Sequence, residues 1–106
     1  MATGRLGAQD LSATTNTTLY TCPASTFAVV NVTICNRNSS GVTVRLAIAS
    51  SATPGNSEYI EYGVTIPANA VLERTGLVLD AGKQIVVYSS TTSVNAVAYG
   101  IETSTT

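Results

Sequence analysis

The chain has 106 residues, of which 44% are hydrophobic and only 10% are charged, with a formal net charge of −1 and no histidine. This length suits one domain, which buries roughly 65% of the surface that its unfolded chain exposes. The five cations are scattered singly, so we expect no nucleic-acid partner, because phosphate binding needs a basic stripe. No apolar run approaches the ~20 residues of a membrane span, so we expect no membrane contact.

Residues 1–16 form a polar segment of small residues with one weak apolar cluster at Leu6 and Leu11. We expect a flexible N-terminal arm that either frays or becomes ordered on a neighbouring molecule, because Leu6, Leu11 and the adjacent Arg5 would need some apolar contact. The segment lacks the apolar core of a signal peptide, so export is not expected.

The longest predicted feature is a β-hairpin over Phe27–Ala49. Its two arms, Phe27–Cys35 and Val42–Ala49, alternate with period two and are rich in β-branched residues, which is typical of half-buried strands. The polar run between them, residues 36–41, contains Asn and Gly, which tolerate the left-handed backbone of a chain reversal.

Further short strands are predicted at roughly ten-residue spacing, separated by Gly, Pro and Asn turns. They are Thr18–Cys22, Glu58–Val64, Val71–Leu79, Gln84–Ser89 and Val94–Glu102. Gly76 interrupts its strand and predicts a bulge or bend, and Asp80–Lys83 predicts a hairpin-type turn.

Seven or eight short strands with no helical periodicity predict an all-β fold. The pattern indicates an antiparallel β-sandwich, and a jelly roll of two four-stranded sheets fits the count best. We expect residues 1–106 to form this single domain, with the arm at about 1–16 and a short mobile C-terminal tail at 103–106.

The chain shows no set of residues for catalysis. It has no histidine, so Cys22 lacks the usual partner base, and Glu58 and Glu61 would lie on opposite faces of a strand. The turn Asp80–Lys83 lacks the further acids or glycines of a calcium or phosphate loop. We therefore expect a protein that is not an enzyme and has no cofactor and no metal site.

The two cysteines and five tyrosines leave alternatives open. Cys22 and Cys35 favour buried free thiols in a reducing compartment, while a single disulfide between them is also compatible with the spacing. We expect most tyrosines to lie in the core with the hydroxyl at its edge. The others would serve a protein interface or a shallow sugar-binding face.

Two long stretches carry a succession of short motifs. The first, TLYTCPASTFAVVNVTICNRNSSGVTVRLAIA (Thr18–Ala49), contains Tyr-x-x-Pro-Ala, Cys-Asn-Arg and Val-Arg-Leu-Ala-Ile. The second, EYIEYGVTIPANAVLERTGLVLDAGKQIVVYSSTTSVNAVAYGIE (Glu58–Glu102), contains Ile-Pro-Ala-Asn, Leu-Glu-Arg-Thr-Gly and Leu-Asp-Ala-Gly-Lys. Together they resemble small structural proteins in the virions of tailed marine and cyanobacterial phages, including the β-sandwich modules of decoration and tail proteins. The resemblance implies no shared site residues.

The resemblance implies a structural protein of the virion, assembled in the host cytoplasm. The expected compact sandwich, the low charge, the flexible polar ends and the lack of catalytic residues and of a signal peptide favour a capsid decoration (cement) protein. Its expected partners are the major capsid protein and further copies of itself, with a trimer or ring as a natural form. A surface with few charges fits a protein that works in an assembly. The expected contacts are strand edges, the arm and one loop, with candidate residues Arg5, Leu6, Leu11, Thr53, Pro54, Gly55 and Asn56. The alternatives are a tail, collar or fibre-attachment component, and a carbohydrate-binding adsorption module.

Overall fold

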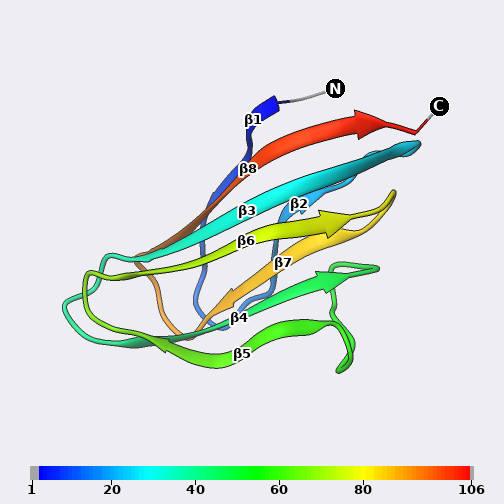
Figure 1. Cartoon of the computed structure of the whole chain (residues 1–106). Coiled ribbons are helices and arrows are strands. Elements are labelled where there is room, and N and C mark those ends of the chain that lie inside the picture. Colours follow the sequence, from blue (N-terminus) through cyan, green and yellow to red (C-terminus); the bar gives the residue numbers. More distant parts are fainter. Residues whose placement is uncertain (1–2, 106) are drawn as a thin grey trace.

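The computed structural model describes residues 3–105, which form eight β-strands (Figure 1). The strands are β1 (Thr3–Asp10), β2 (Thr17–Thr21), β3 (Thr26–Asn36), β4 (Val42–Ala49), β5 (Tyr59–Ile66), β6 (Val71–Leu79), β7 (Gln84–Ser89) and β8 (Val94–Ser104). Within this range, no helix is long and apolar enough to cross a lipid bilayer.

The strands form two antiparallel sheets of four, in the orders β1-β8-β3-β6 and β2-β7-β4-β5. In Figure 1 the layer with β8, β3 and β6 lies above the layer with β7, β4 and β5. Strand β1 pairs with β8, β2 with β7, β3 with β6 and β4 with β5. These are the pairs of one long antiparallel ribbon that turns back between β4 and β5 and is rolled into two layers. This pairing is that of a jelly roll and confirms the predicted all-β sandwich.

The predicted long hairpin over Phe27–Ala49 is wrong, although both of its strands exist close to the predicted bounds. Strand β3 pairs with β6 and β8, whereas β4 pairs with β5 and β7 in the other sheet. Residues 37–41 therefore cross between layers. The turn Asp80–Lys83 also joins strands of different sheets, β6 and β7, so it is not a hairpin turn.

Residues 3–10, which the sequence indicated as part of an arm, form edge strand β1 on β8, with a bulge at Leu6. Gly7 allows this strand to approach β2, because a Cβ at this position would lie 2.2 Å from the carbonyl oxygen of Leu19. At the other terminus β8 continues to Ser104, so the first two residues of the expected tail, Thr103 and Ser104, are strand. The flexibility of the arm stays a prediction, and residues 1, 2 and 106 lie outside the described range.

The core lies between the two sheets and uses the inward positions that the alternation predicted. In β3 and β4 the predicted face is buried at Ala28, Val30, Val32, Ile34, Val42, Val44 and Leu46. At the end of β4 the alternation fails, because Ile48 is half-buried whereas Ala47 and Ala49 of the opposite face are buried. The predicted bulge at Gly76 is confirmed, because Thr75 and Gly76 stand opposite the single residue Asn31 of β3. Gly76 has a φ of 69°, and its N–H donates to Asn31 Oδ1 at 3.0 Å.

One open side of the sandwich is closed by an ion pair between edge strands. Arg74 on β6 and Glu61 on β5 both occupy inward positions, and their charged atoms lie 2.6 Å apart. The side chain of Glu61 is only 18% exposed and that of Arg74 is 41% exposed. Inward charges on edge strands disfavour pairing with a strand of another molecule, so this edge is protected from aggregation.

Candidate interaction surfaces

The described part of the interior is fully packed. Residues 3–105 enclose no pocket, and they contain no group of three or more side chains that could hold a metal ion. Every buried side-chain nitrogen or oxygen in this part of the chain has a hydrogen-bond partner. Features that could bind another molecule therefore lie on the surface.

One end of the sandwich is organised by Asn36, the last residue of β3, which is 1% exposed. Its Nδ2 donates to the carbonyl oxygens of Ser40, Ile66 and Pro67 at 2.9, 3.1 and 3.0 Å. Its Oδ1 accepts from the backbone N–H and the side-chain Nδ2 of Asn38 at 2.9 and 3.0 Å. One buried amide thus joins the β3–β4 connection to the β5–β6 connection.

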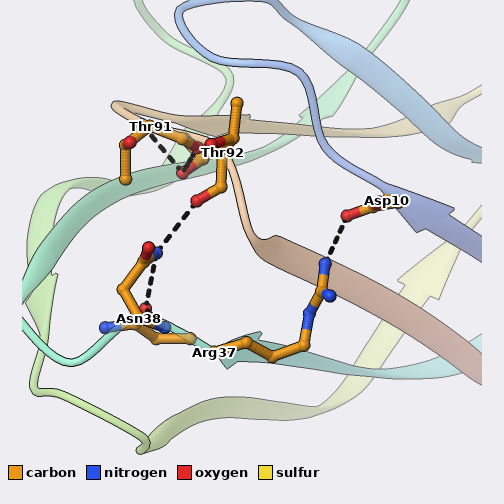
Figure 2. Close-up of polar contacts among 7 residues, drawn as sticks. Asp10, Arg37, Asn38, Thr91 and Thr92 are labelled. Atoms are coloured by element: carbon orange, nitrogen blue, oxygen red, sulfur yellow. Dashed lines mark hydrogen bonds and ion pairs between the residues drawn. The ribbon is translucent and has the colours of Figure 1, made fainter.

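The same end includes the β7–β8 connection and the end of β1 (Figure 2). Asn38 Nδ2 donates to the Thr92 carbonyl at 2.9 Å, and the backbone N–H of Arg37 donates to the Ser93 carbonyl at 2.9 Å. The Arg37 guanidinium also pairs with Asp10 at 2.5 Å. Both charged side chains are about half exposed or more, so this pair adds little stability. The backbone hydrogen bonds and the side-chain amides of Asn36 and Asn38 hold the β3–β4, β5–β6 and β7–β8 connections in a defined conformation.

At the opposite end, the β4–β5 loop contains the predicted residues Thr53, Pro54, Gly55 and Asn56, which lie at the surface. The carboxylate of Glu58 accepts from the backbone N–H groups of Gly55 and Ser50 at 2.7 and 3.1 Å. These hydrogen bonds lower the pKa of Glu58, because they favour its charged form. The loop is therefore held in a defined turn.

An arginine lies between tyrosine rings on the outer face of the β2-β7-β4-β5 sheet. Arg45 on β4 is in register with Tyr88 on β7 and Tyr62 on β5. Its Cζ atom lies 4.3 Å from the Tyr88 ring centre and 4.4 Å from the Tyr62 ring centre. Tyr59 meets Tyr62 edge to face, with 4.9 Å between the ring centres. Arg45, Tyr59, Tyr62 and Tyr88 form what we term the Arg45–tyrosine cluster.

The Arg45–tyrosine cluster is partly open to solvent, because Tyr62 is exposed whereas Arg45, Tyr59 and Tyr88 are half-buried. Tyr62 is 62% exposed, and Arg45 forms no ion pair with any carboxylate of residues 3–105. The stacking rings hold the guanidinium by cation–π attraction and leave its N–H groups to bind an acceptor. A fixed arginine of this kind can recognise a carboxylate on another molecule.

The outer face of the β1-β8-β3-β6 sheet carries an apolar patch. Val29 on β3 stands between Ile101 on β8 and Val78 on β6, and Phe27 lies two residues before Val29 on the same face. Val78 is 63% exposed, Ile101 48% and Phe27 38%. We term these four residues the apolar patch. The outward positions beside it carry Arg5 and Glu73, and the Tyr99 hydroxyl donates to Glu73 at 3.5 Å.

The structure separates the candidate interface residues that the sequence suggested. Arg5 is exposed on β1, but Leu6 packs against the core and Leu11 is 3% exposed within it. Leu11 is therefore a core residue and is not available for docking. The residues of the 53–56 loop follow β4 in the other sheet. Arg45 was not among these candidates, although the alternation of β4 placed it on the face opposite Val44 and Leu46.

The cysteines are free thiols, so the alternative of a disulfide is excluded. Cys22 is buried and its Sγ–H donates to the Thr26 carbonyl at 3.4 Å, and this burial raises its pKa. Cys35 is only half-buried, on the outer side of β3.

The expectation that most tyrosines lie in the core is wrong, because Tyr20 alone of the five is buried. Its hydroxyl donates to Glu102 at 2.5 Å, and burial raises the pKa of this hydroxyl. The other four are half-buried or exposed, since they occupy outward strand positions. More aromatic surface is therefore available for binding than the sequence indicated.

Comparisons with known proteins give limited information. No family model matches the chain, and no curated protein matches its sequence. A solved structure described as "Cyanophage Pam1 capsid asymmetric unit" contains a similar chain, with 15% sequence identity and a TM-score of 0.41. The similarity covers 92% of this chain and 83% of that chain.

Proposed function

We propose that this chain is a non-enzymatic structural protein of a phage virion, a decoration protein that binds the outer shell of the head. The β4–β5 hairpin is the docking element, because it carries Arg45, Tyr59, Tyr62 and the exposed 53–56 loop. The sequence motifs support the virion class. The structural observation that carries the docking proposal is Arg45, stacked between two tyrosine rings and without a carboxylate partner.

Arginine and tyrosine are the residues that most often dominate the energy of protein interfaces. The rings of Tyr62 and Tyr88 already order the guanidinium, so binding loses less side-chain entropy than it would for a free arginine. The planar fork of N–H groups matches a carboxylate with two parallel hydrogen bonds. The partner surface on the shell therefore presents an Asp or Glu side chain, with apolar surface for Tyr62.

A carbohydrate-binding module has weaker support from the same cluster. Tyr62 and Tyr88 each have Arg45 stacked over the ring, and the edge contact with Tyr59 covers more of Tyr62. Sugar binding by stacking needs free aromatic faces, and the cluster uses part of these faces internally. A tail, collar or fibre-attachment component would use the same hairpin in another part of the particle, so it is the main competing function.

Weak individual contacts are sufficient for a decoration protein. A shell presents many identical sites, and copies that also contact one another bind with an effective concentration far above that of the free protein. The Ser- and Thr-rich surface with 10% charged residues is compatible with this assembled state.

The location in the particle is tested by separating purified virions into heads and tails and quantifying the protein in each fraction. We expect it in the heads, in a copy number that scales with the number of capsid subunits. Recovery in tails alone would favour the tail or collar component, and absence from virions would overturn the virion role.

The docking residues are tested with heads that lack the protein. Recombinant wild-type chain should bind them, whereas Arg45→Ala and Tyr62→Ala should each reduce binding by about tenfold or more, as expected for interface hot spots. Arg37→Ala is the matched control, because Arg37 is an exposed arginine in the β3–β4 connection, outside the β4–β5 hairpin. Equal losses for Arg37→Ala and Arg45→Ala would refute docking through the β4–β5 hairpin.

A further inference from the structure

The apolar patch lies on the face that the proposed docking function does not use. Three of its side chains are among the large hydrophobic residues that residues 3–105 leave exposed. We propose that the outer face of the β1-β8-β3-β6 sheet binds the same face of a second copy, which gives a two-fold symmetric dimer. Three observations point to this occupant: the position of the patch, the size of the face and the placement of its charges.

The patch occupies the two central strands of the sheet together with β6. Val29 on β3 is in register with Ile101 on β8 and with Val78 on β6, so the three side chains form one continuous row. Phe27 extends this row along β3. A contiguous exposed apolar row of this kind is a candidate interaction site, because a contact that covers it removes apolar surface from water.

The face is comparable in area to one side of a standard interface. Its four strands lie about 4.8 Å apart and make it roughly 19 Å wide, and the longest dimension of the fold is 46 Å, so the face is bounded at about 900 Å². A standard protein interface buries about 800 Å² on each partner. The row of Val78, Val29 and Ile101 lies on β6, β3 and β8, towards the end of the sheet where β3 begins and β6 ends.

The charges on this face complement themselves under two-fold symmetry. Arg5 lies on edge strand β1, and Glu73 lies on the opposite edge strand, β6. Neither forms an ion pair within residues 3–105, and the Glu73 carboxylate accepts only a long hydrogen bond, of 3.5 Å, from the Tyr99 hydroxyl. In the register, Arg5 belongs to the row of Tyr99, and Glu73 belongs to the next outward row, about 7 Å along the strands.

A two-fold axis that runs parallel to the strands between β8 and β3 places β1 of one copy over β6 of the other. Each Arg5 then comes within side-chain reach of Glu73 in the second copy, and the dimer contains this ion pair twice. The same axis places Ile101 over Val29 of the second copy, so the apolar rows coincide. An isologous contact of this kind closes on itself, and it leaves both β4–β5 hairpins free.

The dimer is tested by sedimentation velocity on the purified full chain over a concentration series. We expect the wild type to sediment as a dimer and Val78→Asp to be a folded monomer, with circular dichroism confirming the β structure. Arg5→Glu should raise the dimer Kd by about tenfold, since it replaces two attractive pairs with two repulsive ones. The double variant with Arg5→Glu and Glu73→Arg should restore the dimer.

Arg45→Glu is the matched control on the other sheet, and it should leave the dimer unchanged. A wild type that is monomeric throughout the series, or that is trimeric, would overturn the proposal. A double charge swap that dimerises no better than Arg5→Glu alone would also overturn the two-fold geometry. These outcomes are independent of head binding, because the docking assay depends on the β4–β5 hairpin.

Discussion

Asn36 is the residue whose replacement should reveal most about how this fold holds its loops. In Asn36→Ala the buried carbonyl of Ile66 loses its side-chain donor, and the carbonyls of Ser40 and Pro67 lose theirs at more accessible positions. An unsatisfied buried polar group costs about 1–3 kcal/mol, and each replaceable hydrogen bond about 1 kcal/mol. We expect unfolding to require about 3 kcal/mol less free energy, a large part of the 5–15 kcal/mol typical of a domain.

Asn36→Asp is a sharper perturbation because it preserves the shape. One carboxylate oxygen would take the place of Nδ2 and face the same three carbonyl oxygens, so the charged form is disfavoured and the pKa of the new carboxyl is raised in the folded state. A group whose folded pKa lies above its unfolded value of about 3.9 stabilises the fold at low pH and loses that contribution as pH rises. Asn36→Asp should therefore be more stable at acidic than at neutral pH, relative to the wild type.

The assay is urea unfolding followed by circular dichroism, with the free energy of unfolding extrapolated to water at several pH values. Asn16→Ala is the control, because Asn16 is exposed before β2 and should change stability by less than about 0.5 kcal/mol. A loss below about 1 kcal/mol for Asn36→Ala would refute the proposed role of the buried amide. An Asn36→Asp variant whose deficit does not depend on pH would refute the electrostatic reasoning.

Two further predictions follow from close contacts in the fold. Gly7→Ala should lower the free energy of unfolding by about 2 kcal/mol, because its Cβ would lie 2.2 Å from the Leu19 carbonyl oxygen. Thermal unfolding measures this loss of stability. Gly41→Ala, whose Cβ would meet its nearest atom at 3.4 Å, should cost much less, and equal losses would contradict the steric argument. Labelling with a thiol reagent should modify Cys35 in the native protein, whereas Cys22 should react only after unfolding, because burial keeps its thiol protonated and covered. Fast native labelling of Cys22 would contradict its position in the core.

The strands were predictable because their signal is local. A strand with one face in the core must alternate, and the residues of β3 and β4 show that alternation directly in the chain. Gln84–Ser89 was predicted with the bounds that β7 has, and Gly76 marked its bulge because few other residues adopt a positive φ. Residues 3–10 were missed because their small polar side chains carry no alternation, and their strand forms on β8.

The candidate binding residues were less predictable, because each depends on neighbours that are distant in sequence. Alternation placed Arg45 on the outer face, but nothing local indicated that Tyr62 and Tyr88 would lie on both sides of it. Leu11 was expected to find its apolar contact on a neighbouring molecule, and it finds that contact in the core of its own chain. Its backbone N–H donates to the Val94 carbonyl, and its side chain is 3% exposed.

By itself, the sequence determined the all-β class, the positions of most strands and which side of each central strand enters the core, because side-chain alternation and turn residues act over a few positions. Only the tertiary structure decided that β3 and β4 lie in different sheets, that Arg45 stacks on two tyrosines, and that the apolar patch shares a face with Arg5 and Glu73. These relations arise from strand pairing, and a strand with one apolar face satisfies its alternation equally well beside several partners. The choice among partners depends on the packing of all eight strands at once.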